Sequence, residues 1–416
     1  MAWLEAYSQE LPNVEGTILH QFLQLNTMKT RNKIAFLIIM ATMLYYQILS
    51  WFSEIGRTEK LLPYLLVSLI FMLLPGFSSN KRGLMVVGTI TLTLFSLALH
   101  DFVSAKNLFI MLLSPIVAYY VADVLHPPLR IAYYWFFLVL IPYSLYAFTS
   151  IEGVFYLPNE NWQVDFFGIN NTKHLMGLAG STLVWTSVFS IKETSSEGGK
   201  TKYIDIILGL LGSYMLIGST ARSYILPFLV IIVYLLIFRH RIKQWFAYIY
   251  FATAIMSTYM LESISSYASP LKKHTILDKF IKADDFELYG VTSGRAWLWA
   301  LHLKWFQSSN YIGKGSSATF NSGDTVDNQI AKAASESVYT GLLAIYGFMG
   351  IVVIIAHISL FVFAVKKNNL LGSALIFFMI YVSVLGDFLM ESSAPLTMLL
   401  FILYIRSFSI QQKIGE

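Results

Sequence analysis

Two arginines and one glutamate have types and surroundings that suit the transfer of a group carried on phosphate. Arg222 lies in IGSTARSYILPF, where the small residues before it leave space for a ligand. Arg295 follows a Thr-Ser-Gly run and begins the stretch RAWLWALHLKWF. A guanidinium stays protonated and presents a planar fork of donors, which matches phosphate oxygens. Glu336, in ASESVYTGLLAIYGFMG, is a carboxylate that can accept a proton from a hydroxyl nucleophile.

Each of these residues also has an ordinary structural explanation. An arginine at a helix end commonly anchors the helix at a membrane surface, and a glutamate at a helix start stabilises the helix N-terminus. Lys173 and His174, in FFGINNTKHLMGLAG, suit anion binding or proton transfer, but both are also normal residues at a membrane surface. From the residues alone, both interpretations stay open.

The stretch that begins at Arg295 predicts an interfacial helix. It is too short to span a membrane, and its tryptophans and leucines are typical of helices that lie at headgroup depth. If the helix is regular, Arg295, Trp299, His302 and Phe306 share one face. Free N–H groups at a helix start attract anions, so a phosphate can meet both the arginine and those amides.

The composition identifies the elements that must position these residues. Of 416 residues, 56% are hydrophobic and 13% are charged, about half the charged share of a soluble protein. The net charge of +5 is small and spread along the chain, so we expect no nucleic-acid partner. Cysteine is absent, which excludes disulfides and thiol nucleophiles. The expected fold is an all-α, polytopic integral membrane protein.

Long apolar runs bounded by charged residues predict twelve transmembrane helices, at about 33–52, 61–76, 83–99, 107–125, 131–150, 174–191, 203–218, 223–238, 245–261, 337–364, 370–386 and 394–408. We therefore expect a cytoplasmic segment 1–32, helices one to nine over 33–261, a large periplasmic loop 262–335 that contains short amphipathic helices, helices ten to twelve over 336–408, and a cytoplasmic tail 409–416.

The distribution of basic residues supports this orientation. Sixteen of the 29 Lys and Arg residues fall in segments assigned to the cytoplasm, five in short external segments, and eight in the long loop. Arg222 and Lys173 are among the five, so the orientation rule does not account for them.

Several other kinds of site are disfavoured. The eight histidines lack the spacing of metal ligands, and the acidic stretches of the long loop lack that of a calcium loop. There is no nucleotide-binding P-loop, and few charges fall inside the predicted spans. We expect neither a metal nor a cofactor.

Three landmarks, the first of them a pair of segments, resemble in this order along 160–350 the O-antigen polymerase and ligase superfamily, the Wzy and WaaL glycosyltransferases. FGINNTKHLMGLAG and GSTARSYILPFLVI resemble its Gly-polar-Lys-Asn and Ser-Arg patterns, with His174 in place of the Asn. VTSGRAWLWALHLKWFQSSNYIGKGSSATF is similar to its Ser-Gly-Arg, Trp and Gly-x-Gly pattern, here with Gly313 and Gly315. ESVYTGLLAIYGFMG has Glu336 and Ser337 where ligases carry His and Asn, which resembles the acidic pattern of polymerases.

The resemblance implies a GT-C-like fold and an inverting, metal-independent glycosyl transfer at the periplasmic face of the bacterial inner membrane. The donor would be a glycan on undecaprenyl diphosphate and the acceptor a lipid-linked repeat unit, with a chain-length regulator and a flippase as pathway partners. Arg222 and Arg295 would bind the diphosphate, and Glu336 would orient or deprotonate the acceptor hydroxyl. The residues that would contact substrate are Asn170, Lys173, His174, Ser293, Trp299, His302 and Tyr339.

Two other functions compete with a polymerase. A ligase would transfer the glycan to a lipid A core, and Glu336 in place of His argues against it. A polysaccharide flippase would perform no chemistry, and it should show polar residues along a path through both membrane halves, whereas the polar residues here gather at one face.

Overall fold

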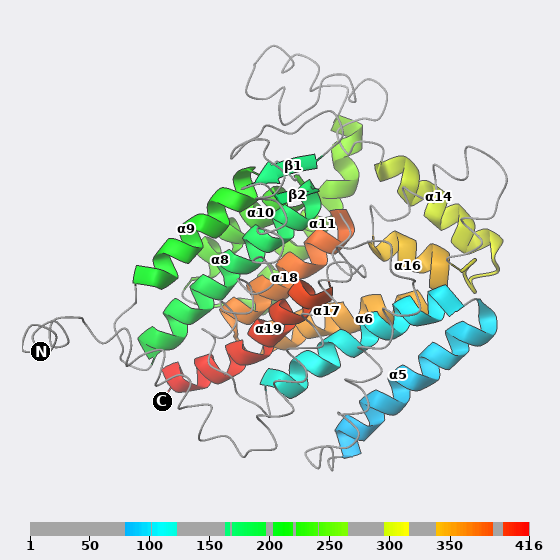
Figure 1. Cartoon of the computed structure of the whole chain (residues 1–416), viewed down its shortest axis with the longest axis horizontal. Helices are drawn as coiled ribbons and strands as arrows, with labels where there is room; N and C mark the ends of the chain where they lie inside the picture. Colours follow the sequence, from blue (N-terminus) through cyan, green and yellow to red (C-terminus); the bar gives the residue numbers. More distant parts are fainter. Residues whose placement is uncertain are drawn as a thin grey trace, which may run out of the picture.

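The structure is a computed structural model that describes residues 80–100, 102–122, 163–166, 169–196, 203–218, 222–239, 241–264, 295–315, 338–385 and 394–415. The regular elements among these residues are helices apart from one small hairpin (Figure 1). The elements are α5 (Asn80–Leu99), α6 (Phe102–Tyr120), β1 (Gln163–Phe166), β2 (Ile169–Thr172), α8 (Lys173–Ser196), α9 (Tyr203–Gly218), α10 (Arg222–Phe238), α11 (Gln244–Ile264), α14 (Arg295–Ser308), α16 (Val338–Tyr346), α17 (Phe348–Lys366), α18 (Leu370–Leu385) and α19 (Ala394–Gly415).

The helical architecture expected from the sequence is confirmed for these residues. The predicted helices at 203–218, 223–238 and 370–386 agree with α9, α10 and α18 to within a residue at each end. α19 continues to Gly415, through residues expected to form a tail. The predicted spans 33–52, 61–76 and 131–150 lie outside the described residues.

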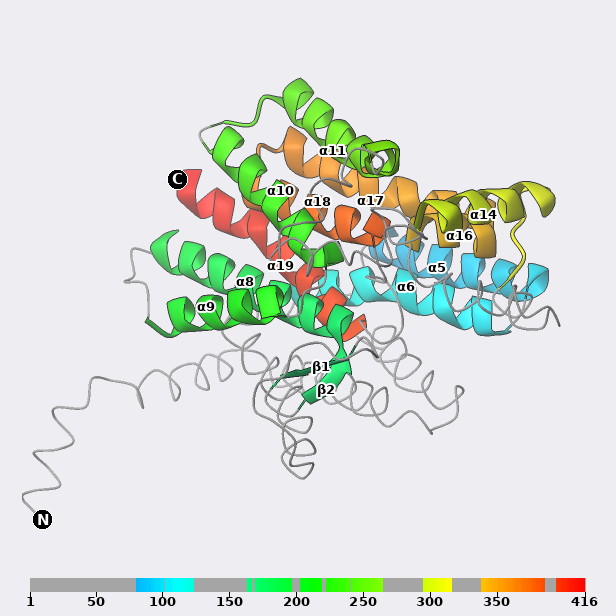
Figure 2. The ribbon, with the colours of Figure 1, turned by 90° about the horizontal axis from the view of Figure 1, so that it is seen from above.

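The antiparallel hairpin is an addition to the expected all-α fold. β1 pairs with β2 so that Gln163 lies opposite Thr172 and Phe166 opposite Ile169. β2 leads directly into α8, because Thr172 ends the strand and Lys173 begins the helix. The hairpin therefore lies at the N-terminal end of α8 (Figures 1 and 2).

The segment predicted as one span at 337–364 consists of two helices, so that prediction is wrong. α16 ends at Tyr346 and α17 begins at Phe348, with Gly347 between them at a φ of 56°. Glycine adopts this left-handed conformation without the steric cost of a side chain. The break faces another part of the chain, because the Phe348 N–H donates to the Tyr311 carbonyl at 2.9 Å. An apolar run carries no signal of such a contact.

α18 forms the centre of the helical core. Every residue from Gly372 to Leu385 is buried, as expected for a helix that is apolar on all sides. α10, α11, α16, α17 and α19 pack against it. The Tyr234 hydroxyl of α10 donates to Ser373 at 3.1 Å, and Thr258 of α11 donates to the Tyr381 hydroxyl at 3.0 Å. These bonds fix both neighbours against the central helix.

α8 and α9 pack closely because small residues meet at their contact. A Cβ on Gly180 would lie 2.6 Å from the Leu216 nitrogen and 2.8 Å from the Gly212 oxygen. Asp205, at the start of α9, is buried in the same contact, where Ser190 donates to its carboxylate at 3.0 Å. Small residues are typical of helix contacts inside membranes, where backbones approach closely.

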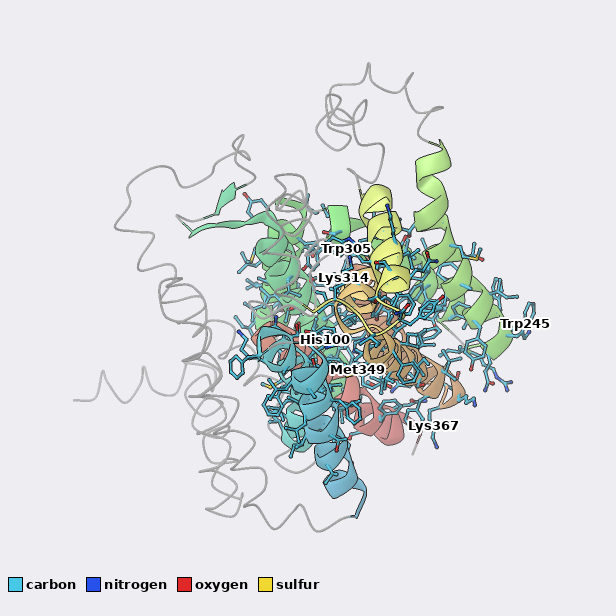
Figure 3. The ribbon with its side chains drawn as sticks, turned by 90° about the vertical axis from the view of Figure 1, so that its right-hand side faces the viewer. His100, Trp245, Trp305, Lys314, Met349 and Lys367 are labelled. Carbon is cyan, nitrogen blue, oxygen red and sulfur yellow. The ribbon has the colours of Figure 1, made fainter. Side chains whose placement is uncertain are left out.

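The outer surfaces of several helices are strongly apolar. By length and composition, one helix within the described ranges, Phe348–Lys366, is able to cross a membrane, with a mean hydropathy of 2.7. Shorter apolar helices include Tyr203–Ile217, Ser223–Phe238 and Leu370–Leu385. Trp245 projects from the start of α11 and is 65% exposed (Figure 3). Other large exposed apolar side chains are Tyr203, Ile207, Leu210, Ile217, Leu229, Leu236, Met256, Phe348 and Ile355.

Candidate functional site

Three of the basic residues singled out from the sequence are the first residues of helices. Lys173 begins α8, Arg222 begins α10 and Arg295 begins α14. Glu336 and Ser293 lie outside the described residues, and α16 begins two residues after Glu336, at Val338. Also outside the described part are the side chains of Arg222, Arg295, Lys173, His174 and Asn170.

The N-terminal ends of α8, α10 and α14 lie on the same side of the molecule. This is the upper side in Figure 1, where the hairpin also lies. Each helix start presents backbone N–H groups that have no partner within the helix, together with the positive end of the helix dipole. Each of these three ends, with its basic first residue, is therefore suited to an anion.

α14 is held in place by packing on α16. His302 has no exposed surface, and its Nδ1 forms a 2.9 Å hydrogen bond with the Thr340 hydroxyl of α16. Trp299, one turn before it, is 4% exposed. The predicted shared face therefore holds Trp299 and His302, but both are buried within the protein rather than open to a ligand. Their position suits anchoring of the helix that Arg295 begins.

Tyr339 is also buried, with 7% of its surface exposed. Its hydroxyl forms a 3.2 Å hydrogen bond with His357 Nδ1 of α17, and the His357 ring stacks on Phe401 of α19. Sequence reasoning missed His357 and Thr340. A histidine in the middle of an apolar span is itself a signal, because polar groups in such places are costly unless they are paired. Thr340 has no comparable signal.

The segment after α14 fastens the C-terminal end of α16. The Lys314 N–H donates to the Ala344 carbonyl at 2.9 Å, and the Gly315 N–H to the Ile345 carbonyl at 3.0 Å. Gly313 and Gly315, the glycines of the Gly-x-Gly pattern, have φ values of 94° and 74°. These bonds satisfy carbonyls that the end of a helix leaves without partners.

Two further contacts hold the same segment. Lys314 Nζ lies 5.5 Å from the centre of the Trp305 ring, a cation–π geometry (Figure 3). His100, after the end of α5, forms a 3.1 Å hydrogen bond with the Ile312 carbonyl through Nε2. α14 is therefore fixed along one face by α16 and at its C-terminal end by this segment, which sets the place of its N-terminus.

Burial lowers the pKa of His302 from its ordinary 6.5 to about 4. The folded protein thus keeps this imidazole neutral where an unfolded chain protonates it. As the pH falls from about 6.5 to about 4, the unfolded state binds the proton first, and the free energy of unfolding decreases. Above pH 6.5 both states are neutral and this effect disappears.

We expect His302→Gln to remove part of the acid sensitivity of the protein. Between pH 7.5 and pH 5, the wild type should lose about 2 kcal/mol more free energy of unfolding than the variant, since each pKa unit corresponds to about 1.4 kcal/mol. Thermal unfolding midpoints measured at both pH values in one detergent provide the comparison. An identical pH dependence for the two proteins would contradict the buried neutral histidine.

Within the described ranges, no group of three or more His, Asp or Glu residues is placed to hold a metal ion. Comparison with protein-family models, with curated proteins and with solved structures finds no match for this chain.

Proposed function

We propose that this protein is a membrane glycosyltransferase that polymerises oligosaccharide repeat units carried on undecaprenyl diphosphate, at the periplasmic face of the bacterial inner membrane. The observation that carries the proposal is that Lys173, Arg222 and Arg295 begin three helices whose N-terminal ends lie on one side of the molecule. A diphosphate brought there would meet guanidinium groups and free backbone N–H groups together.

The membrane placement in this proposal is supported by the surface of the helices. Large apolar side chains are exposed along α9, α10, α11 and α17. In water, a surface of this kind would favour association or aggregation, whereas lipid chains would cover it. Basic residues follow α10 and α17 at the other end of the bundle, as expected for a cytoplasmic face. The twelve-span topology and the GT-C-like architecture belong to the same proposal.

The proposed reaction is a single displacement. The acceptor hydroxyl attacks the anomeric carbon of the donor, the new glycosidic bond forms with inversion, and undecaprenyl diphosphate leaves with the electron pair of the broken bond. Glu336 takes the hydroxyl proton. Arg222 and Arg295 bind the departing diphosphate and offset its charge, the part that a divalent cation plays in other enzymes.

The remaining residues have two kinds of role in the proposal. Lys173, His174 and Asn170, at the end of the hairpin and the start of α8, would contact substrate, as would Ser293. Trp299, His302 and Tyr339 would be positioning residues, because they are buried and join α14, α16 and α17. They would act by fixing the helix starts at which the substrate binds.

Reconstitution in liposomes with purified lipid-linked repeat units tests the proposal. We expect a ladder of longer lipid-linked glycans together with release of undecaprenyl diphosphate, and we expect the ladder to form in the presence of a chelator. Glu336→Gln should slow it by about 100-fold or more, the usual contribution of a general base. Transfer only to an added lipid A core would instead show a ligase, and movement across the bilayer without bond formation would show a transporter.

A further inference from the structure

A second polar site lies at the opposite end of the helices from the starts of α8 and α10. A cavity of about 540 Å³ opens between the end of α8, the connection from α10 to α11, the start of α18 and the later part of α19. This volume is typical of a small-molecule site. Three basic residues, Lys192, Arg239 and Arg241, contribute to its lining.

Several neutral polar groups of the cavity are hydrogen-bonded within the protein. The Asn368 Oδ1 accepts from the Ile242 N–H at 3.0 Å, and the Asn369 Nδ2 donates to Ser407 at 2.6 Å. Gln411 donates to the Asn368 carbonyl at 3.0 Å. These bonds hold the lining residues of the connection, α18 and α19 in fixed positions relative to one another. Among the cationic residues of the lining, Lys192 and Arg241 are the groups suited to a ligand.

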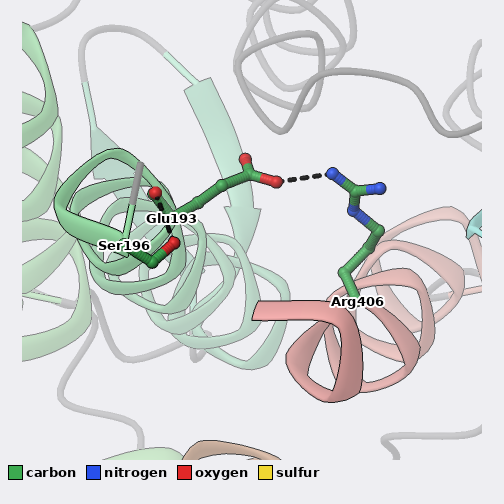
Figure 4. A network of polar contacts seen from close by, with 3 residues as sticks. All are labelled: Glu193, Ser196 and Arg406. Carbon is green, nitrogen blue, oxygen red and sulfur yellow. Dashed lines mark hydrogen bonds and ion pairs between the residues drawn. The ribbon is translucent and has the colours of Figure 1, made fainter. Parts of the chain in front are cut away.

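The described lining of the cavity carries positive charge. No Asp or Glu is among the described residues that line it. Glu193 follows Lys192 in the chain, but its carboxylate forms a 2.5 Å ion pair with Arg406 (Figure 4). Both partners of this pair are mostly buried, which strengthens it against screening by salt. The acid nearest to Lys192 in sequence is therefore engaged elsewhere.

We propose that this cavity binds the headgroup of an anionic phospholipid. Its phosphate would lie between Lys192 and Arg241, and its glycerol and first methylene groups would contact the apolar lining, which includes Phe238 and Leu371. A soluble anion would gain nothing from that apolar part, whereas a lipid uses both. Basic pockets between transmembrane helices on the cytoplasmic side suit such headgroups, because that leaflet is anionic. This inference rests on the proposed membrane placement, but not on glycosyl transfer.

Thermal unfolding of the full-length protein in nanodiscs tests the site. The wild type should unfold about 2 °C or more higher in phosphatidylcholine containing phosphatidylglycerol than in phosphatidylcholine alone, because a ligand of the folded state raises the midpoint. The double variant Lys192→Gln/Arg241→Gln should lose most of this shift. The matched control Lys243→Gln/Lys366→Gln removes two exposed positive charges at the same end but none from the cavity lining, and it should keep the shift.

Two results would overturn the proposal. If the two double variants lose the shift equally, surface charge accounts for the effect and the cavity does not. If soluble glycerol phosphate, added to nanodiscs of phosphatidylcholine alone, raises the midpoint as much as phosphatidylglycerol does, the ligand is a free phosphate and not a lipid. If the wild type polymerises repeat units but its unfolding midpoint does not rise with phosphatidylglycerol, the lipid site is refuted and the proposed function is not, since the polymerisation assay does not depend on the cavity.

Discussion

Replacing Arg222 or Arg295 by lysine is expected to slow polymer formation by about 100-fold or more, in the range seen when one preorganised donor to a developing charge is lost. Each arginine begins a helix, so a lysine at that place preserves the charge and the helix dipole interaction. What it loses is the planar fork that donates two parallel hydrogen bonds to phosphate oxygens. The measurement is the initial rate of ladder formation in liposomes, at equal amounts of folded protein.

The double variant sharpens this prediction. If both arginines bind the same diphosphate, Arg222→Lys/Arg295→Lys should be less impaired than the product of the two single effects, because residues that act on one group are not additive. Arg82→Lys is the matched control, since Arg82 lies in the first turn of α5 and is assigned by sequence to the cytoplasmic face. It should retain the wild-type rate. Normal chain lengths from both single variants would refute the diphosphate site.

The parts of the fold that sequence predicted are those with a local physical cause. The helix at 203–218 was predicted with its observed ends because an apolar run lies between a lysine and a Ser-Thr pair. The helix that begins at Arg295 is confirmed, since α14 runs from Arg295 to Ser308, whereas its place at a membrane interface stays a prediction. Arg295 as the first residue of that helix followed from the Thr-Ser-Gly run before it. The spacing of apolar residues and the helix-breaking residues at each end are enough to predict such helices.

The parts that sequence did not predict depend on contacts between distant segments. The hydrogen bond between His302 and Thr340 joins residues 38 positions apart, and the sequence around each residue does not indicate that the two are in contact. The family resemblance implies that His302 contacts substrate, whereas the structure buries it between α14 and α16. The hairpin at 163–172 is not predicted because each strand has only four residues, too few for the alternation in QVDF to stand out, and INNT does not alternate. Glu336 stays a prediction from sequence, outside the described residues.

The break between α16 and α17 gives the prediction with the largest effect on stability. We expect Gly347→Ala to lower the free energy of unfolding by about 2–4 kcal/mol, through backbone strain at positive φ and a clash that cannot relax within the segment. Gly347 has a φ of 56°, and a Cβ there would lie 2.2 Å from the Tyr311 oxygen and 2.2 Å from the Ile312 carbonyl carbon. The atoms it would meet belong to the backbone, so no side-chain rotation can relieve the contact.

Gly88→Ala supplies the matched control, because a Cβ on that glycine in α5 would meet nothing within 4 Å. It should be neutral or raise stability by up to about 1 kcal/mol, the helix propensity of alanine over glycine. Thermal unfolding midpoints in one detergent compare the two variants, and equal midpoints would refute the strain at Gly347.

The residual polymerisation rate of Gly347→Ala, measured at a temperature where the variant is folded, then tests whether this break affects activity. The segment after α14 rests on this glycine and sets the place of the Arg295 helix, so a folded variant should still be slower than Gly88→Ala.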